Sequence, residues 1–80
     1  MKKKLEEIIK NNIKDSQIII RDINNDNNHF DIIIISDQFE GLSLIKQHRM
    51  VYDALDGIIT KTIHAIQLKT YTYKLWKKEN

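Results

Sequence analysis

The segment from His29 to Tyr52 reads HFDIIIISDQFEGLSLIKQHRMVY and decides the fold. It contains a continuous apolar run, Ile32 to Ile35, of the kind found in a strand that is covered on both faces or lies at the centre of a sheet. Gly41 then indicates a bend, because glycine adopts backbone angles that are closed to other residues. Ser43 is a good N-cap residue for a helix. The segment therefore predicts a central strand, a bend and a helix.

The helix that follows Ser43 is predicted to be amphipathic. Its apolar stripe consists of Leu44, Ile45, His48, Val51, Tyr52, Leu55 and Ile58. Lys46 and Arg49 fall off this stripe and are candidates for contact with a partner or a nucleic acid, with a solvated charge as the alternative. We expect His48, which lies on the stripe, to be a packed and hydrogen-bonded structural histidine.

The flanking sequence supplies the other elements of the domain. In chain order we predict a helix over 2–12, a strand over 17–23, an Asn-rich turn over 24–28, the central strand over 29–36, a strand over 63–69 and a helical segment over 72–78. A helical connection between two strands favours parallel pairing. The prediction is an α+β fold of order α-β-β-α-β-α, with a three-stranded mixed sheet and helices on one face.

Composition restricts the class of protein. The chain has 80 residues, which fits a single domain over 1–80, and its net charge of +2 is too small for an electrostatic footprint on nucleic acid. No apolar run approaches the roughly 20 residues of a membrane span, and residues 1–13 do not resemble a secretion signal. We therefore expect a cytoplasmic protein with no membrane partner.

Catalytic chemistry finds little support in the residues. Ser43 and His48 are five positions apart and do not share a helix face, so they do not form a nucleophile–base pair. The two glycines stand apart and do not make a phosphate-binding loop. The chain also contains no cysteine, which excludes disulfides and any metal site built from its own thiolates. We expect a binding protein, not an enzyme.

Two motifs resemble the BolA/IbaG family. The first is the apolar strand, then Phe-x-Gly at residues 39–41, then a helix carrying His48-Arg49 with Val-Tyr at 51–52. The second is IHAIQLKTYT at residues 63–72, with Trp76 four residues on. Many members have proline where Tyr73 stands. The resemblance covers nearly the whole chain and implies a fold similar to the class II KH domain.

The resemblance also implies a partner and a cofactor. Members of the family pair with a monothiol glutaredoxin and share a [2Fe–2S] cluster in the heterodimer, and they are linked to iron homeostasis and iron–sulfur trafficking. A [2Fe–2S] cluster takes four ligands, usually thiolates, with two histidines on one iron as a known alternative. This chain has three histidines and no cysteine. We therefore expect no cluster in the isolated chain, with the remaining ligands supplied by glutaredoxin and glutathione.

Two histidines are candidates for the cluster. His64 stands at the family's signature histidine and is the first candidate ligand, with a half-buried structural histidine as the alternative. His29 is the second candidate, because members often supply a further ligand from this hairpin loop, with an exposed strand-start residue as the alternative. Some members are described as transcriptional regulators. The competing hypothesis is a nucleic-acid-binding transcriptional regulator that uses the KH-like fold, with Lys46 and Arg49 as candidate contacts and DNA as a possible partner. A homodimer is also left open.

Overall fold

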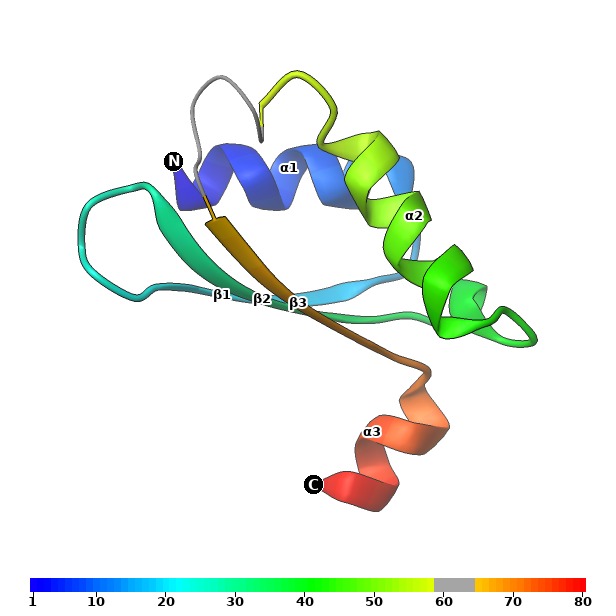
Figure 1. Cartoon of the computed structure of the whole chain (residues 1–80). Coiled ribbons are helices and arrows are strands. Elements are labelled where there is room, and N and C mark those ends of the chain that lie inside the picture. The colour runs from blue at the N-terminus through cyan, green and yellow to red at the C-terminus, as the bar shows by residue number, and fades with distance from the viewer. Residues whose placement is uncertain (59–64) are drawn as a thin grey trace.

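The computed structural model describes residues 1–58 and 65–80 (Figure 1). Its elements are α1 (Lys2–Asn12), β1 (Gln17–Asp22), β2 (His29–Ile35), a one-turn 3-10 helix η1 (Asp37–Phe39), α2 (Leu44–Ala54), β3 (Ala65–Tyr71) and α3 (Tyr73–Glu79). This is the order α-β-β-α-β-α, with η1 as an addition, and it confirms the predicted fold class.

The three strands form one mixed sheet with β2 at its centre. β1 and β2 are antiparallel and bring Gln17 opposite Ile35, whereas β2 and β3 are parallel and bring His29 opposite Ala65. The parallel pair is the one that the helical connection predicted. The central position of β2 agrees with its apolar run: Ile32, Ile34 and Ile35 are buried, whereas Ile33 on the second face is half-buried.

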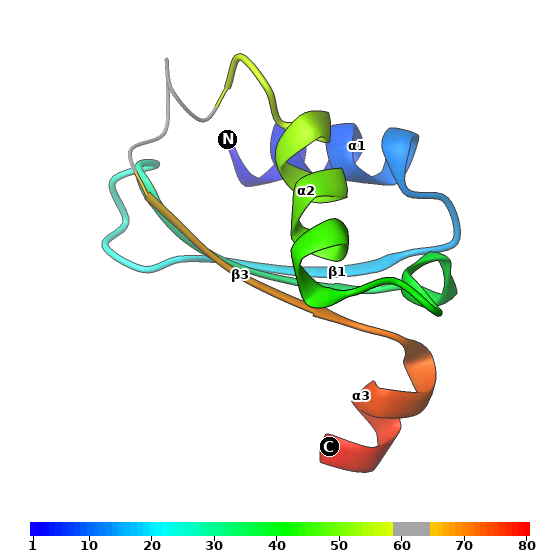
Figure 2. The same ribbon diagram turned by 45° about the vertical axis from the view of Figure 1, so that its right-hand side comes forward.

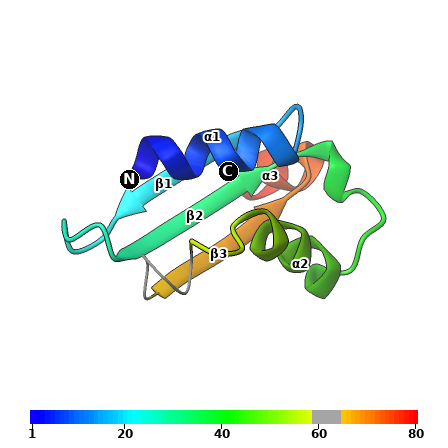
Figure 3. The ribbon, with the colours of Figure 1, turned by 90° about the horizontal axis from the view of Figure 1, so that it is seen from above.

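One face of the sheet carries the main core. Alternation along β2 turns Phe30, Ile32 and Ile34 to this face, and each is buried. They form one cluster with Leu5 and Ile9 of α1 and with residues of η1 and α2. Seen from above, α1 lies along β1 and β2, and α2 lies beside β3 (Figure 3). These two helices fulfil the expectation of helices on one face.

α3 lies on the opposite side of the sheet (Figures 1 and 2). The alternation of β2 turns Ile35 toward this second face, and Ile35 is fully buried although it lies outside the main cluster. Tyr71 is the register partner of Ile35, and its ring packs edge-on against Trp76 of α3, with the ring centroids 5.2 Å apart. α3 therefore packs against the second face at the end of the sheet where Ile35 and Tyr71 lie.

α3 begins at Tyr73, the position at which many family members have proline. Thr72 caps the helix by accepting a hydrogen bond from the backbone N–H of Leu75. Tyr73, the first helical residue, donates its backbone N–H to Asp37 of η1 at 3.3 Å. Proline has no N–H and would remove this contact. The departure leaves α3 in place and ties it to η1.

α2 begins as predicted, but the expected apolar stripe is only partly buried. Val51 and Leu55 are buried in the main core, whereas Leu44, Ile45 and Tyr52 are 61%, 72% and 42% exposed. Tyr52 and Ile45 lie on the flank of the helix, about 80° and about 100° from the midpoint of Val51 and Leu55 at about 100° per residue. Leu44 lies on the buried side, but in the first turn, where it remains mostly exposed. The stripe was therefore predicted too wide and too long.

Removing the N-cap of α2 is expected to destabilise the fold measurably. The Ser43 hydroxyl accepts a hydrogen bond from the backbone N–H of Lys46 at 3.2 Å. Ser43→Ala should cost about 1 kcal/mol in the free energy of unfolding, because that N–H loses its partner. Urea denaturation measures the change, and Ser43→Asp, which keeps an acceptor, is the control. Equal losses in both variants would contradict the capping role.

No helix within residues 1–58 and 65–80 combines the length and apolarity needed to cross a membrane.

Candidate metal-ligand site at the hairpin loop

The structure describes one of the two predicted cluster ligands. His29 is the first residue of β2 and follows the loop that connects β1 to β2. His64 lies outside the described residues. Ala65, which follows His64 in the chain, is the register partner of His29, and its backbone N–H donates to the carbonyl of Asn28 at 3.2 Å. The beginning of β3 and the beginning of β2 therefore lie side by side.

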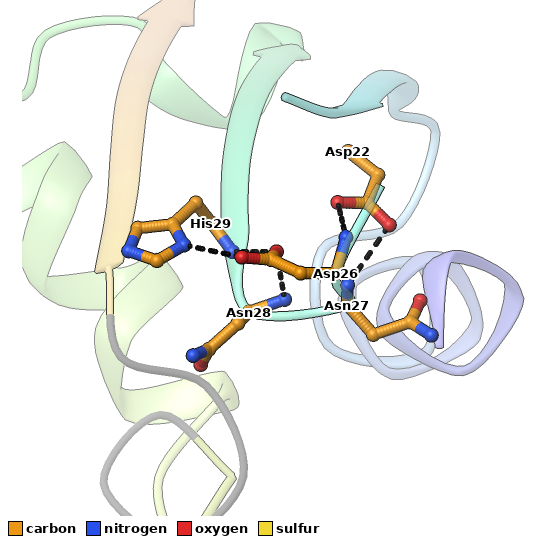
Figure 4. A network of polar contacts seen from close by, with 5 residues as sticks. All are labelled: Asp22, Asp26, Asn27, Asn28 and His29. Carbon is orange, nitrogen blue, oxygen red and sulfur yellow. Dashed lines mark hydrogen bonds and ion pairs between the residues drawn. The ribbon is translucent and has the colours of Figure 1, made fainter. Parts of the chain in front are cut away.

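The hairpin loop is held by its own carboxylates and amides (Figure 4). Asn25 and Asn27 both have φ of +56°, a conformation that asparagine tolerates better than most residues. The carboxylate of Asp22 accepts the backbone N–H of Asp26 at 3.2 Å and that of Asn27 at 3.0 Å. The Asn-rich sequence thus builds a defined turn just ahead of His29.

Asp26 connects this turn to the candidate ligand. Its Oδ1 accepts the backbone N–H groups of Asn28 at 2.9 Å and His29 at 3.3 Å. Its Oδ2 lies 3.0 Å from Nδ1 of the His29 ring. The side chains of His29 and Asp26 are 40% and 39% exposed, so the ring is held and also accessible. Asp26 was not among the residues predicted from the sequence, where its one signal is an aspartate three residues before a loop histidine.

The environment of Asp26 favours its charged form. Desolvation would by itself raise the pKa of the carboxyl, but the hydrogen bond with the His29 ring and those from the backbone N–H groups of Asn28 and His29 lower it, and the pKa lies below the ordinary value of 3.8. These contacts therefore stabilise the folded loop above the ordinary pKa of aspartate, and the stabilisation is lost as the pH falls through the lowered pKa.

The lowered pKa of Asp26 can be tested by an acid titration. On acidification, the backbone amide NMR shifts of Asn28 and His29 are expected to move together with a midpoint below 3.8, because both amides donate to the Asp26 carboxylate. The Asp26→Asn variant lacks the carboxylate that accepts these two N–H groups and should lose this transition. A midpoint at or above the ordinary value would contradict the proposed environment.

The other histidine within the described residues is placed differently. His48 is half-buried on α2, and its Nε2 atom is buried without a hydrogen-bond partner. The packing agrees with the expected structural role, but the expected hydrogen bond at this nitrogen is absent. A metal on a partner protein could not reach a buried Nε2 atom without rearrangement of α2. His48 is therefore a poor candidate for a shared metal.

The two basic candidates lie on α2. Lys46 and Arg49 are both exposed and are one turn apart, so they share a helix face. Leu44 and Ile45, which are exposed in the same region, make this surface partly apolar. The structure does not bring Lys46 and Arg49 together with His29: the helix starts at the far end of the sheet from the hairpin loop (Figure 3).

The donor set can be compared with the needs of a metal. Within residues 1–58 and 65–80, no group of three or more histidine, cysteine, aspartate or glutamate side chains is arranged to hold a metal ion. His29 offers one accessible imidazole, and the whole chain offers no thiolate. An iron–sulfur cluster accepts imidazole in place of thiolate on one iron. The residues fit a contribution of part of a ligand set, completed from outside.

Comparison with known proteins agrees with the motifs and the fold. A family described as BolA-like protein matches residues 3–74. An uncharacterised protein of Rickettsia prowazekii is 44% identical over 66 residues, which cover 82% of this chain and 86% of that protein. The DNA-binding transcriptional regulator BolA of Escherichia coli is 41% identical over 49 residues, which cover 61% of this chain and 47% of that protein.

The solved structures extend the likeness to the three-dimensional fold. BolA1 from Arabidopsis thaliana superposes with a TM-score of 0.82 at 28% sequence identity, and the match covers 90% of each chain. The element order, the mixed sheet and the match of residues 3–74 lead to one conclusion. The chain belongs to the BolA-like protein family.

Proposed function

We propose that this protein pairs with a monothiol glutaredoxin and shares or transfers a [2Fe–2S] cluster in iron homeostasis. The observation that supports the proposal most is the placement of His29, the second candidate ligand. It is an accessible imidazole at the start of β2, opposite Ala65 at the start of β3, and Ala65 follows the first candidate, His64, in the chain. His29 and Ala65 are far apart in sequence, and the pairing of β2 with β3 brings them together at one end of the sheet.

The number of ligands that this chain can supply makes a partner necessary for cluster binding. Two imidazoles supply at most two of the four ligands of a [2Fe–2S] cluster, and no thiolate is available in this chain. The remaining two come from the glutaredoxin cysteine and glutathione. We expect the protein to act in a compartment that contains glutathione, and the cytoplasm is that compartment in this proposal.

The role of this chain is binding and positioning. In this proposal His29 and His64 each supply one ring nitrogen, and the register of β2 and β3 fixes His29 opposite Ala65, the residue after His64. A cluster with imidazole ligands differs in reduction potential and lability from one held by thiolates alone. Because an imidazole must be unprotonated to bind a metal, cluster sharing should weaken as the pH falls through the range in which histidines protonate.

The experiment is reconstitution with a purified monothiol glutaredoxin, glutathione, iron and sulfide, followed by visible circular dichroism. A spectrum distinct from that of the glutaredoxin homodimer would support the proposal. An unchanged glutaredoxin spectrum, together with the absence of a heterodimer in size-exclusion chromatography, would refute cluster sharing by this protein.

A second candidate function is binding to DNA. Two observations favour it: the E. coli relative is named a DNA-binding transcriptional regulator, and Lys46 and Arg49 are both exposed on one face of α2. A salt-dependent gel shift would support it. The slope of the logarithm of the binding constant against the logarithm of the salt concentration should fall in magnitude by about two in the Lys46→Glu, Arg49→Glu double variant. The matched control reverses Lys74 and Lys77, which are exposed on α3. Equal loss in both double variants would indicate nonspecific charge attraction.

A further inference from the structure

The contact between Asp26 and His29 defines which ring nitrogen is available. An ionised carboxylate only accepts hydrogen bonds, so the proton in the 3.0 Å contact belongs to Nδ1 of His29. In a neutral imidazole with Nδ1–H, the lone pair is on Nε2. Figure 4 shows Nε2 turned away from Asp26. The carboxylate thus selects the tautomer in which the nitrogen remote from Asp26 can bind a metal.

The carboxylate is itself fixed before it meets the ring. The backbone N–H of Asp26 is bound by Asp22, and its Oδ1 is occupied by the backbone N–H groups of Asn28 and His29. Only Oδ2 is directed to the imidazole. A surface aspartate without these contacts would be free to change rotamer, whereas two backbone N–H groups hold this carboxylate and the bond to Asp22 holds the backbone that carries it.

We infer that Asp26 is a positioning residue for metal binding by His29: it holds the ring at the start of β2, keeps the proton on Nδ1 and leaves Nε2 free for iron on the partner. This inference rests on the proposed function and deepens it. Histidine ligands of metals in proteins characteristically donate their other ring N–H to a carboxylate or carbonyl group, which orients the ring and raises its basicity. Asp26 is in the position to supply that contact here.

The variant that isolates this contact is Asp26→Asn. Asparagine keeps one carbonyl oxygen for the backbone N–H groups of Asn28 and His29, but its NH2 group cannot accept from Nδ1–H. The loop therefore keeps its backbone bonds while the ring loses its acceptor. The matched control is Asp31→Asn on the same strand, which removes the same charge two residues from His29, and Asp31 is not the acceptor in the Nδ1 contact.

The first measurement needs no cluster. Long-range ¹H–¹⁵N NMR of the apo protein at pH 8 reports which nitrogen of each neutral imidazole carries the proton. Wild type and Asp31→Asn should show His29 protonated at Nδ1, and Asp26→Asn should shift the proton toward Nε2. A wild-type His29 protonated at Nε2, or a tautomer unchanged in Asp26→Asn, would overturn the inference.

The second measurement uses the heterodimer with a monothiol glutaredoxin. Asp26→Asn should shorten the lifetime of the shared cluster about tenfold, the lower end of the usual effect for an outer-shell partner, and Asp31→Asn should leave it unchanged. If His29→Ala shortens the lifetime and Asp26→Asn does not, the positioning role is wrong and cluster sharing stands. If His29→Ala has no effect while His64→Ala does, His29 is not a ligand and the role of Asp26 falls with it. If wild type shares no cluster, the proposed function itself fails.

Discussion

His64→Ala is expected to abolish the shared cluster with a monothiol glutaredoxin. The variant removes one of the two proposed imidazole ligands, and the chain has no cysteine to replace it. His48 is not a substitute, because its Nε2 atom is buried. The loss in cluster lifetime should exceed the roughly 100-fold upper range for an outer-shell residue. Visible circular dichroism should then revert to the spectrum of the glutaredoxin homodimer.

His48→Gln is the control for this experiment. It removes the one histidine that the proposal does not use, so the spectrum of the shared cluster should remain. Far-UV circular dichroism of each variant establishes that the fold is retained. A wild-type spectrum and lifetime in His64→Ala would contradict the assignment of His64, and a loss in His48→Gln with the fold intact would point to the wrong histidine.

The element order could be predicted because the local signals agree with the tertiary structure. The predicted range of the first helix, 2–12, coincides with α1, and the apolar run of the central strand became β2. Ser43 caps α2, and Gly41 adopts φ of +74° in the bend before it. Each of these is decided within a few residues of the chain, by periodicity, capping or backbone freedom.

The candidate site was only partly predictable. His29 was predicted from its place in the loop and from the family resemblance, but Asp26 was not. The sequence of an Asn- and Asp-rich turn does not indicate which carboxylate contacts the His29 ring. That choice depends on the turn geometry. Asn25 and Asn27 take positive φ, and the Asp22 carboxylate accepts the backbone N–H groups of Asp26 and Asn27. The partners of a loop side chain are set by backbone dihedrals that periodicity does not report.

The burial of α2 shows the same limit for packing. A helical stripe specifies direction around the axis, but not how much of the helix its neighbours cover. Leu44 and Leu55 are both on the side that includes Val51, yet Leu44 is 61% exposed and Leu55 is fully buried. The difference lies along the axis, because α2 starts beyond the part of the core that covers its later turns.

Leu55 and Leu44 form a matched pair for mutagenesis, because they have the same side chain and differ in burial. Leu55→Ala is expected to cost about 2–5 kcal/mol in the free energy of unfolding, through lost burial and the cavity left in the core. For a domain of this size, whose whole stability is on the order of 5–10 kcal/mol, that loss should lower Tm by more than about 10 °C. Leu44→Ala removes the same atoms from an exposed position and should stay within about 0.5 kcal/mol of wild type.

Urea denaturation measures the free energy of unfolding of the two variants. The m-values should be equal, so that a difference in the midpoint reports a difference in stability. Similar losses in both would mean that Leu44 is covered in solution. If the loss in Leu44→Ala grows with protein concentration, the cover is a second copy of the chain, because only an association equilibrium couples stability to concentration. If it is independent of concentration, the first turn of α2 packs within the monomer, and its exposed fraction here is wrong.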